Sequence, residues 1–126
     1  KYTNTVASIL GVRKILRALQ RKIAKKNNIV MEGRDIGTCV FPNANFKFYL
    51  DASPKERAKR RYEELKAKGH RVNLKQIENS IARRDYLDIT RGINPLKKAK
   101  DAIRIDTTNM TLTEVADFII ERIQQK

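Results

Sequence analysis

Oppositely charged side chains follow a short apolar segment in the first half of the chain. The segment IVMEGRDIGT, residues 29–38, begins as an apolar run and places Arg34 beside Asp35 between two glycines. A guanidinium offers a forked donor to an anion, a carboxylate is an acceptor, and glycine lets the backbone approach a ligand closely. Taken alone, an Arg-Asp dipeptide in a turn is also explained by a surface ion pair, which is the more common situation.

A second charged group lies in the second half of the chain. Within ARRDYLDITR, the spacing of Arg84, Asp88 and Arg91 is i, i+4 and i+7, so the three side chains share one face of a helix. The helix-ending segment GINPL follows, which places the cluster at a helix end beside a loop. A solvated charged face explains many such clusters, but helix ends beside loops also border binding sites.

Helices and strands alternate along the chain and must position both groups. Apolar residues at steps of three and four predict a helix over residues 5–27, in which Gly11 indicates a bend or a later start. The stripe expected to face inward is Ile9, Val12, Leu16, Leu19 and Ile23. Short apolar or alternating runs predict strands over residues 28–33, 46–52 and 101–107. The alternation predicts an α/β fold with a parallel sheet.

Capping residues predict the remaining helices. These are a helix from the capping box Ser53-Pro54-Lys55-Glu56 to Gly69, one from Asn73 that ends before Pro95, and one opened by Thr111 with Glu114. Inward-facing residues are predicted at Leu74, Ile77, Ile81 and Leu87 in the second of these helices and at Val115, Phe118, Ile119 and Ile123 in the last.

Composition limits the classes of function. The 126 residues suffice for one domain, and 28 Lys and Arg against 14 Asp and Glu predict attraction to polyanions. No apolar run approaches the ~20 residues of a membrane span. A single cysteine, Cys39, and a single histidine, His70, exclude an internal disulfide and a Cys/His zinc site, so no residue is assigned to a metal. A soluble protein of the reducing cytoplasm fits this composition.

The order and spacing of several short motifs resemble the later part of bacterial cytidylate kinases, from about Asn4 to the carboxyl terminus. The matching segments are Val12-Arg13, residues 33–38, Phe41-Pro42, residues 51–53, Arg84-Asp85, Asp88, Arg91, Pro95-Leu96 and residues 106–108. The resemblance implies a P-loop nucleoside monophosphate kinase-like three-layer fold, of which residues 1–126 are a single partial domain, the carboxyl-terminal part, with a lid near residues 60–75.

The resemblance also implies a site that recognises cytosine by hydrogen bonds. Arg13 is similar to the family's fork for the acceptors O2 and N3, and Asp35 to its carboxylate for the amino group. Uracil has a hydrogen on N3 and an oxygen at C4, so the same pair would meet donor with donor and acceptor with acceptor. Asn4 aligns with a base-contacting serine of the family, from which its reach differs.

Further roles follow from the same resemblance. Arg34 resembles the residue that holds the monophosphate, Arg84 and Asp88 those around the sugar, and Arg91 one close to base and phosphate. Arg57, Arg60 and Arg61 resemble the basic residues that lead into the lid. The implied catalytic residues are Arg57, Arg61 and Arg91, because phosphoryl transfer requires positioning and positive charge around the migrating group.

The implied reaction transfers the γ-phosphoryl group of ATP, with Mg²⁺, to CMP or dCMP, without nucleic-acid or membrane partners. The sequence contains no Gly-x-x-x-x-Gly-Lys-Ser/Thr loop, so the donor has no cradle in these 126 residues. We therefore expect a carboxyl-terminal fragment that turns over no ATP alone and is unstable or self-associating, whereas the full-length enzyme is expected to be a monomer.

Two other functions remain open from sequence. A non-catalytic nucleotide-binding subunit would retain the ligand residues and lack the donor loop. A nucleic-acid-binding module would fit the positive charge, although no recognised nucleic-acid motif is present.

Overall fold

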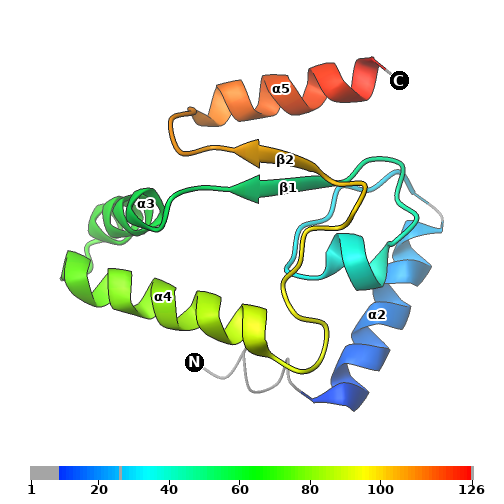
Figure 1. Ribbon diagram of the computed structural model, residues 1–126, viewed down its shortest axis with the longest axis horizontal. Helices are drawn as coiled ribbons and strands as arrows, with labels where there is room; N and C mark the ends of the chain where they lie inside the picture. Colours follow the sequence, from blue (N-terminus) through cyan, green and yellow to red (C-terminus); the bar gives the residue numbers. More distant parts are fainter. Residues whose placement is uncertain (1–8, 26, 126) are drawn as a thin grey trace.

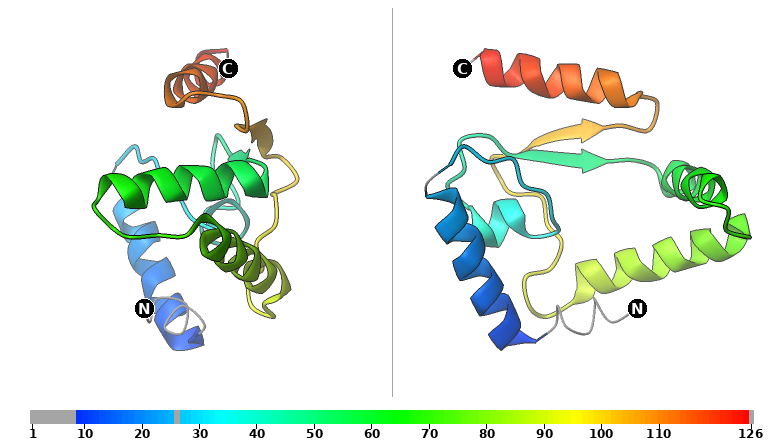
Figure 2. Two further views of the ribbon diagram at one scale, coloured as in Figure 1. Left: turned by 90° about the vertical axis from the view of Figure 1, so that its left-hand side faces the viewer. Right: turned by 180° about the vertical axis from the view of Figure 1, so that it is seen from behind.

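The computed structural model describes residues 9–25 and 27–125 as an open α/β arrangement (Figure 1). The elements in chain order are α2 (Leu10–Ala24), the π-helical turn η1 (Ile36–Val40), β1 (Phe48–Asp51), α3 (Pro54–Ala67), α4 (Leu74–Thr90), β2 (Ile103–Asp106) and α5 (Leu112–Gln124). The views of Figure 2 place α5 on one side of the strand pair, with α4 and α2 on the other side.

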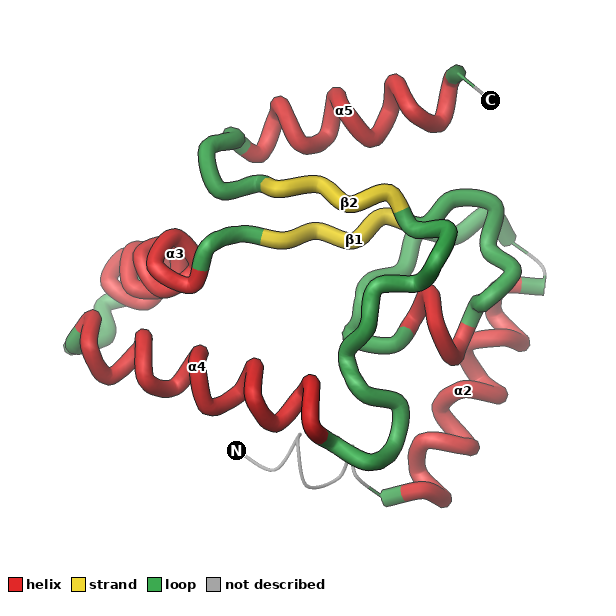
Figure 3. The backbone as a smooth tube through the Cα atoms, in the orientation of Figure 1, coloured by secondary structure: helices red, strands yellow, loops and turns green. Residues whose placement is uncertain are grey.

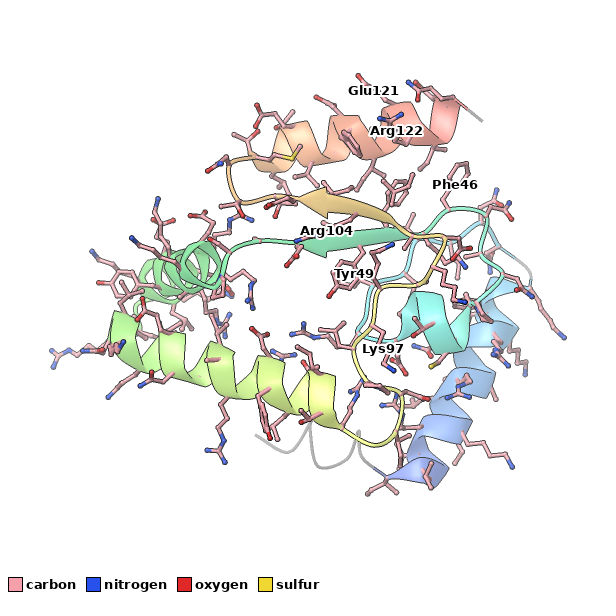
Figure 4. All side chains as sticks on the ribbon, viewed as in Figure 1. Phe46, Tyr49, Lys97, Arg104, Glu121 and Arg122 are labelled. Carbon is pink, nitrogen blue, oxygen red and sulfur yellow. The ribbon has the colours of Figure 1, made fainter. Side chains whose placement is uncertain are left out.

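The described strands form one parallel pair, as the alternation of helices and strands predicts (Figure 3). Phe48 pairs with Ile103 and Asp51 with Asp106. The connection from β1 to β2 runs through α3 and α4. Arg104 also donates to Asp51 across the pair at 2.6 Å (Figure 4). The two strands predicted over residues 46–52 and 101–107 are thus confirmed, each in a shorter form.

The third predicted strand, over residues 28–33, was wrong. The described residues of this segment have no strand hydrogen bonds, and Val30 is fully exposed. Apolar content favours a strand only where a neighbouring strand accepts and donates the backbone hydrogen bonds. In the described residues β1 and β2 pair with each other alone, so this segment has no such neighbour.

The predicted caps open the helices. The side chains of Ser53 and Asn73 accept from the backbone N–H three residues on, each at 3.2 Å. Thr111 and Glu114 form the complete reciprocal box. At Ser53 the second half of the box is replaced, because its N–H donates to Thr108 Oγ1 at 2.9 Å and thereby ties α3 to the end of β2. Gly69 follows α3 with a φ of 78°, a conformation that favours glycine.

The buried core is small for a chain of this length. A folded monomer of 14.6 kDa is expected to expose about 6,900 Å², whereas this chain exposes 10,232 Å². The buried apolar residues are Val40, Ala52, Ala58, Ile77, Ile105 and Val115. They come from β2 and the residue after β1, from α3, from the first turns of α4 and α5, and from the end of η1.

Several predicted inward faces are therefore exposed. In α2 no described residue is buried, and its predicted stripe is about half exposed at Ile9, Leu16, Leu19 and Ile23. Leu74 and Leu87 in α4 and Ile123 in α5 are also exposed, whereas Ile77 and Val115 are buried as predicted. The spacing identified apolar faces correctly, but a face is buried only where another element covers it. The start of the first helix before residue 9 lies outside the described residues.

Candidate functional site

The loop that carries Arg34 and Asp35 is shaped by its own backbone. The amides of Cys39 and Val40 donate to the carbonyl of Asp35 at 2.9 and 3.3 Å, which forms the π-helical turn η1 directly after the charged pair. A Cβ atom at Gly33 would lie 2.7 Å from Ile36 Cγ1, so the chain bends most easily there with glycine. The turn thus fixes the backbone positions from which the Arg34 and Asp35 side chains extend.

Helix α2 holds this turn from the side. Arg21 donates through Nε to the carbonyl of Val40 at 2.8 Å and through Nη2 to that of Cys39 at 3.0 Å. Both acceptors lie at the end of η1, where carbonyl groups leave the turn without partners of their own. These two bonds hold α2 and the loop together.

Arg13 of α2 and Asp35 of the loop form a direct ion pair. Arg13 Nη2 donates to Asp35 Oδ2, although the residues are 22 positions apart in the chain. Only 14% and 15% of the two side chains are exposed. Burial to this degree reduces screening by water and salt, so the two groups interact more strongly than a surface pair. The structure thus brings together the two residues that the family resemblance assigns to one base.

Three arginines surround the carboxylate of Asp88, on the last turns of α4. Arg34 Nε lies 3.2 Å and Arg84 Nε 3.8 Å from Asp88 Oδ2, and Arg91 Nη1 lies 3.8 Å from Oδ1. Asp88 itself is 14% exposed. One negative charge against three positive charges leaves a local surplus, which favours binding of an anion.

Among the described residues, two buried atoms of this cluster have no hydrogen-bond partner. They are Arg91 Nη2 and Asp88 Oδ2, whose 3.2 Å contact with Arg34 Nε is an ion pair without hydrogen-bond geometry. Buried polar groups are normally hydrogen-bonded, and exceptions in a native structure often mark a site for a ligand or water. The cluster therefore has an acceptor and a donor for a bound polar molecule.

The two charged groups are neighbours. Arg34 and Asp35 are consecutive in the loop, so the Arg13 pair and the Asp88 cluster meet there. An open hollow of about 510 Å³ lies beside Arg13, between α2 and residues Ile93 and Asn94. A second hollow, bordered by Phe46 and Arg122, lies between the amino-terminal ends of the strands and the end of α5 (Figure 4) and contains none of the predicted site residues.

The arginines predicted for the lid make structural contacts. Arg57 bonds to Asp85 of α4 at 2.8 Å and to the carbonyl of Ala52 at 3.0 Å. Arg60 donates to the carbonyl of Thr107 at 2.6 Å. These bonds join α3 to α4 and to the end of β2, so both side chains take part in packing the helices.

Arg61 pairs with Glu64 within α3 at 2.5 Å. The bonds from Lys68 and Arg61 lower the pKa of Glu64 to about 2, because they stabilise the ionised carboxylate. Arg57, Arg60 and Arg61 therefore lie on α3, and Arg57 reaches Asp85, one turn before Asp88 on α4. The predicted base contact Asn4 lies outside the described residues.

Sequence reasoning missed several contributors. Asn94, Arg17 and Arg21 received no role, yet Arg21 holds η1, and Asn94 contacts Arg91 and, through its side chain, α2. The signal available was the spacing of Arg13, Arg17 and Arg21 at steps of four, which places them along one face of a helix.

The described residues include no group of three or more His, Cys, Asp or Glu side chains able to hold a metal ion. Among these residues, no helix has the length and apolar character to cross a membrane. The sequence contains no Gly-x-x-x-x-Gly-Lys-Ser/Thr motif.

Comparison with known proteins gives one consistent result. A model of the family described as "Cytidylate kinase" matches residues 1–125. A cytidylate kinase of Clostridium acetobutylicum is 54% identical over 120 residues, which are 95% of this chain and 55% of that protein. The cytidylate kinases of Clostridium tetani and Bacillus licheniformis are 53% and 50% identical and are covered over 52% and 54% of their length. The chain thus spans about half the length of these curated relatives, and it belongs to the cytidylate kinase family.

Proposed function

We propose that this chain supplies the monophosphate-binding part of a kinase that transfers the γ-phosphoryl group of ATP to CMP or dCMP. The observation that carries the proposal is the ion pair of Arg13 and Asp35, formed from two distant segments beside the arginine-rich cluster at Asp88. Membership of the cytidylate kinase family supports the same function.

The ion pair has the polarity of a cytosine edge. A guanidinium directed at O2 and N3 and a carboxylate directed at the amino group satisfy the base, and in the ligand-free protein the two groups satisfy each other. Uracil at the same place would leave polar groups unpaired, which costs more than a missing contact in water. The pair therefore favours CMP over UMP.

The Asp88 cluster has the charges for the rest of a nucleoside monophosphate. Arg34, the nearest arginine to Asp88, is placed to hold the phosphate, and the Asp88 carboxylate to accept from a sugar hydroxyl. Arg84 and Arg91 flank the same carboxylate. A phosphate that replaces Asp88 as the partner of these arginines would release the carboxylate for the sugar.

The donor half of the reaction requires more polypeptide than this chain. Mg²⁺ would place positive charge against the triphosphate of ATP, and a Gly-rich loop would hold the phosphate groups. No such loop occurs in the sequence. The proposed function is therefore that of a complete enzyme to which these residues contribute the acceptor site.

A chimaera tests the proposal. The chain would be placed behind the amino-terminal part of the Clostridium acetobutylicum cytidylate kinase, a relative that it matches over 55% of its length. We expect the chimaera to phosphorylate CMP in preference to UMP with ATP and Mg²⁺, and the 126-residue chain alone to turn over no ATP. A folded chimaera without CMP kinase activity, or phosphorylation by the chain alone, would contradict the proposal.

The absent donor loop also favours a second candidate, a subunit that binds a nucleotide without catalysis. Under this alternative the chain binds CMP by calorimetry, and the chimaera gains no turnover. The surplus of 14 positive charges keeps nucleic-acid binding as a further outcome of the same titration. Duplex DNA would then bind more tightly than CMP, with an affinity that falls steeply with salt.

A further inference from the structure

The loop after α4 folds back onto the helix that it leaves. The amide of Leu96 donates to the carbonyl of Asp88 at 2.7 Å, so residues 91–96 form a closed turn beside the charged cluster. Within it Asn94 has a backbone φ of 48°. This left-handed conformation is accessible to Asn, Asp and Gly and unfavourable for most other residues. The turn thereby places Asn94 between α4 and α2.

Asn94 contacts both charged groups of the site. Its main-chain carbonyl accepts from Arg91 Nε at 2.7 Å. With the amide oxygen turned toward α2, the orientation that its neighbours require, its side chain accepts from Arg17 Nη2 at 2.8 Å and from Arg13 Nη2 at 3.3 Å. One residue therefore bonds to the cytosine-reading arginine and to an arginine of the Asp88 cluster.

We propose that Asn94 is a positioning residue that sets base specificity by fixing the orientation of the Arg13 guanidinium. This inference rests on the proposed function, because it assigns Asn94 to the base-reading part of that site. Asp35 and Asn94 both approach Nη2 of Arg13, and two acceptors on one nitrogen restrict rotation of the guanidinium plane. A planar fork can pair with O2 and N3 only when it lies in the plane of the base.

The neutrality of the amide matters for the same role. Asn94 accepts from two arginines without adding a charge, so Asp35 remains the ionic partner of Arg13. Arg17 lies one helical turn beyond Arg13 and shares the acceptor. The side chain of Asn94 thus orients Arg13, whereas its main-chain carbonyl orients Arg91. A substitution at position 94 changes the first contact and keeps the second.

Two variants keep the left-handed backbone and differ in the acceptor. Asn94→Gly removes the side-chain oxygen, and Asn94→Asp retains one, while both keep the carbonyl that accepts from Arg91. The chimaera described above would be titrated by calorimetry with CMP, UMP and ribose 5-phosphate. Ribose 5-phosphate has no base, so it reports the sugar and phosphate part of the site alone.

We expect Asn94→Gly to lower the ratio of CMP to UMP affinity about tenfold, the size of one well-placed hydrogen bond. Its affinity for ribose 5-phosphate should stay within twofold of the parent. Asn94→Asp retains an acceptor but adds a charge that competes with Asp35 for Arg13, so it should restore only part of the base preference. Equal loss for all three ligands, full discrimination in Asn94→Gly, or the same loss in both variants would each overturn the inference.

The parent chimaera separates this inference from the proposed function. A parent that binds CMP and UMP equally contradicts the proposed function, and the role of Asn94 in base specificity falls with it. A parent that discriminates, together with an Asn94→Gly variant that discriminates equally well, leaves the proposed function in place and removes Asn94 from it. Circular dichroism of each variant verifies that the helices are retained.

Discussion

At the scale of residues, the shape of a side chain in this site matters as well as its charge. Arg13 and Asp35 form a partly buried pair, so each leaves the other unsatisfied when it is removed. A lysine at position 13 would keep the positive charge but lose the planar fork. Charge and geometry can therefore be tested separately at one position.

We expect Arg13→Lys and Arg13→Met to abolish the preference for CMP over UMP to a similar extent in the chimaera. The reason is that base reading requires two parallel donors, which neither substitution supplies. The measurement is kcat/KM for both nucleotides, with Lys14→Met as a control, because Lys14 is the exposed neighbour on α2. Arg13→Lys with the parent's selectivity would remove the forked contact from the mechanism.

For the site, the sequence placed Arg13 and Asp35 together but did not predict all of their surroundings. Arg13 and Asp35 were assigned to one ligand edge, and they are in contact in the structure. Their role toward a base stays a prediction. Asn94 escaped prediction because its contribution comes from a backbone conformation and from contacts across loops. Sequence spacing does not describe such contacts, whereas it describes a helix face directly.

At the scale of elements, the predictions that rested on contacts within a few residues were confirmed. The caps at Ser53, Asn73 and Thr111 open helices where predicted, since each bond joins residues three apart. The strand predicted over residues 28–33 and the buried face predicted for α2 depended instead on partners distant in the chain. The described residues supply no such partners, and these predictions were wrong for that reason.

Ser53 provides a test at this scale. Ser53→Ala should destabilise the chain by about 1 kcal/mol, because the N–H of Glu56 loses its acceptor at the start of α3. Ser53→Asp retains an acceptor and should restore most of the loss. Urea denaturation followed by circular dichroism measures both. An alanine variant as stable as the parent would show that the cap contributes nothing to α3.

At the scale of the whole molecule, the chain exposes many large apolar side chains. Ile15 is 70% exposed on α2 and Leu112 88% exposed on α5, alongside the exposed stripe of α2. Exposed apolar patches of this extent occur at interfaces and promote association. In the part of the chain that the structure describes, β1 and β2 pair only with each other, and strand edges without a partner also promote association.

We therefore expect the 126-residue chain to self-associate, and the chimaera to remain monomeric, in sedimentation-velocity experiments over a range of concentrations. Ile15→Lys with Leu19→Lys should reduce self-association of the chain, because both residues are exposed on α2 and lie four positions apart. Lys14→Glu serves as a control for charge on the same helix. A chain that sediments as a monomer throughout would show that these surfaces do not drive association.

Helix α4 connects the Asp88 cluster with α3. It has 17 residues and is therefore about 25 Å long, with Asp88 near one end and the turn at Gly69 just beyond the other. Arg57 of α3 bonds to Asp85, one turn before Asp88 on the same helix. Exchange of the partners of Asp88 would therefore be transmitted to α3 over a short distance, through the Arg57–Asp85 pair.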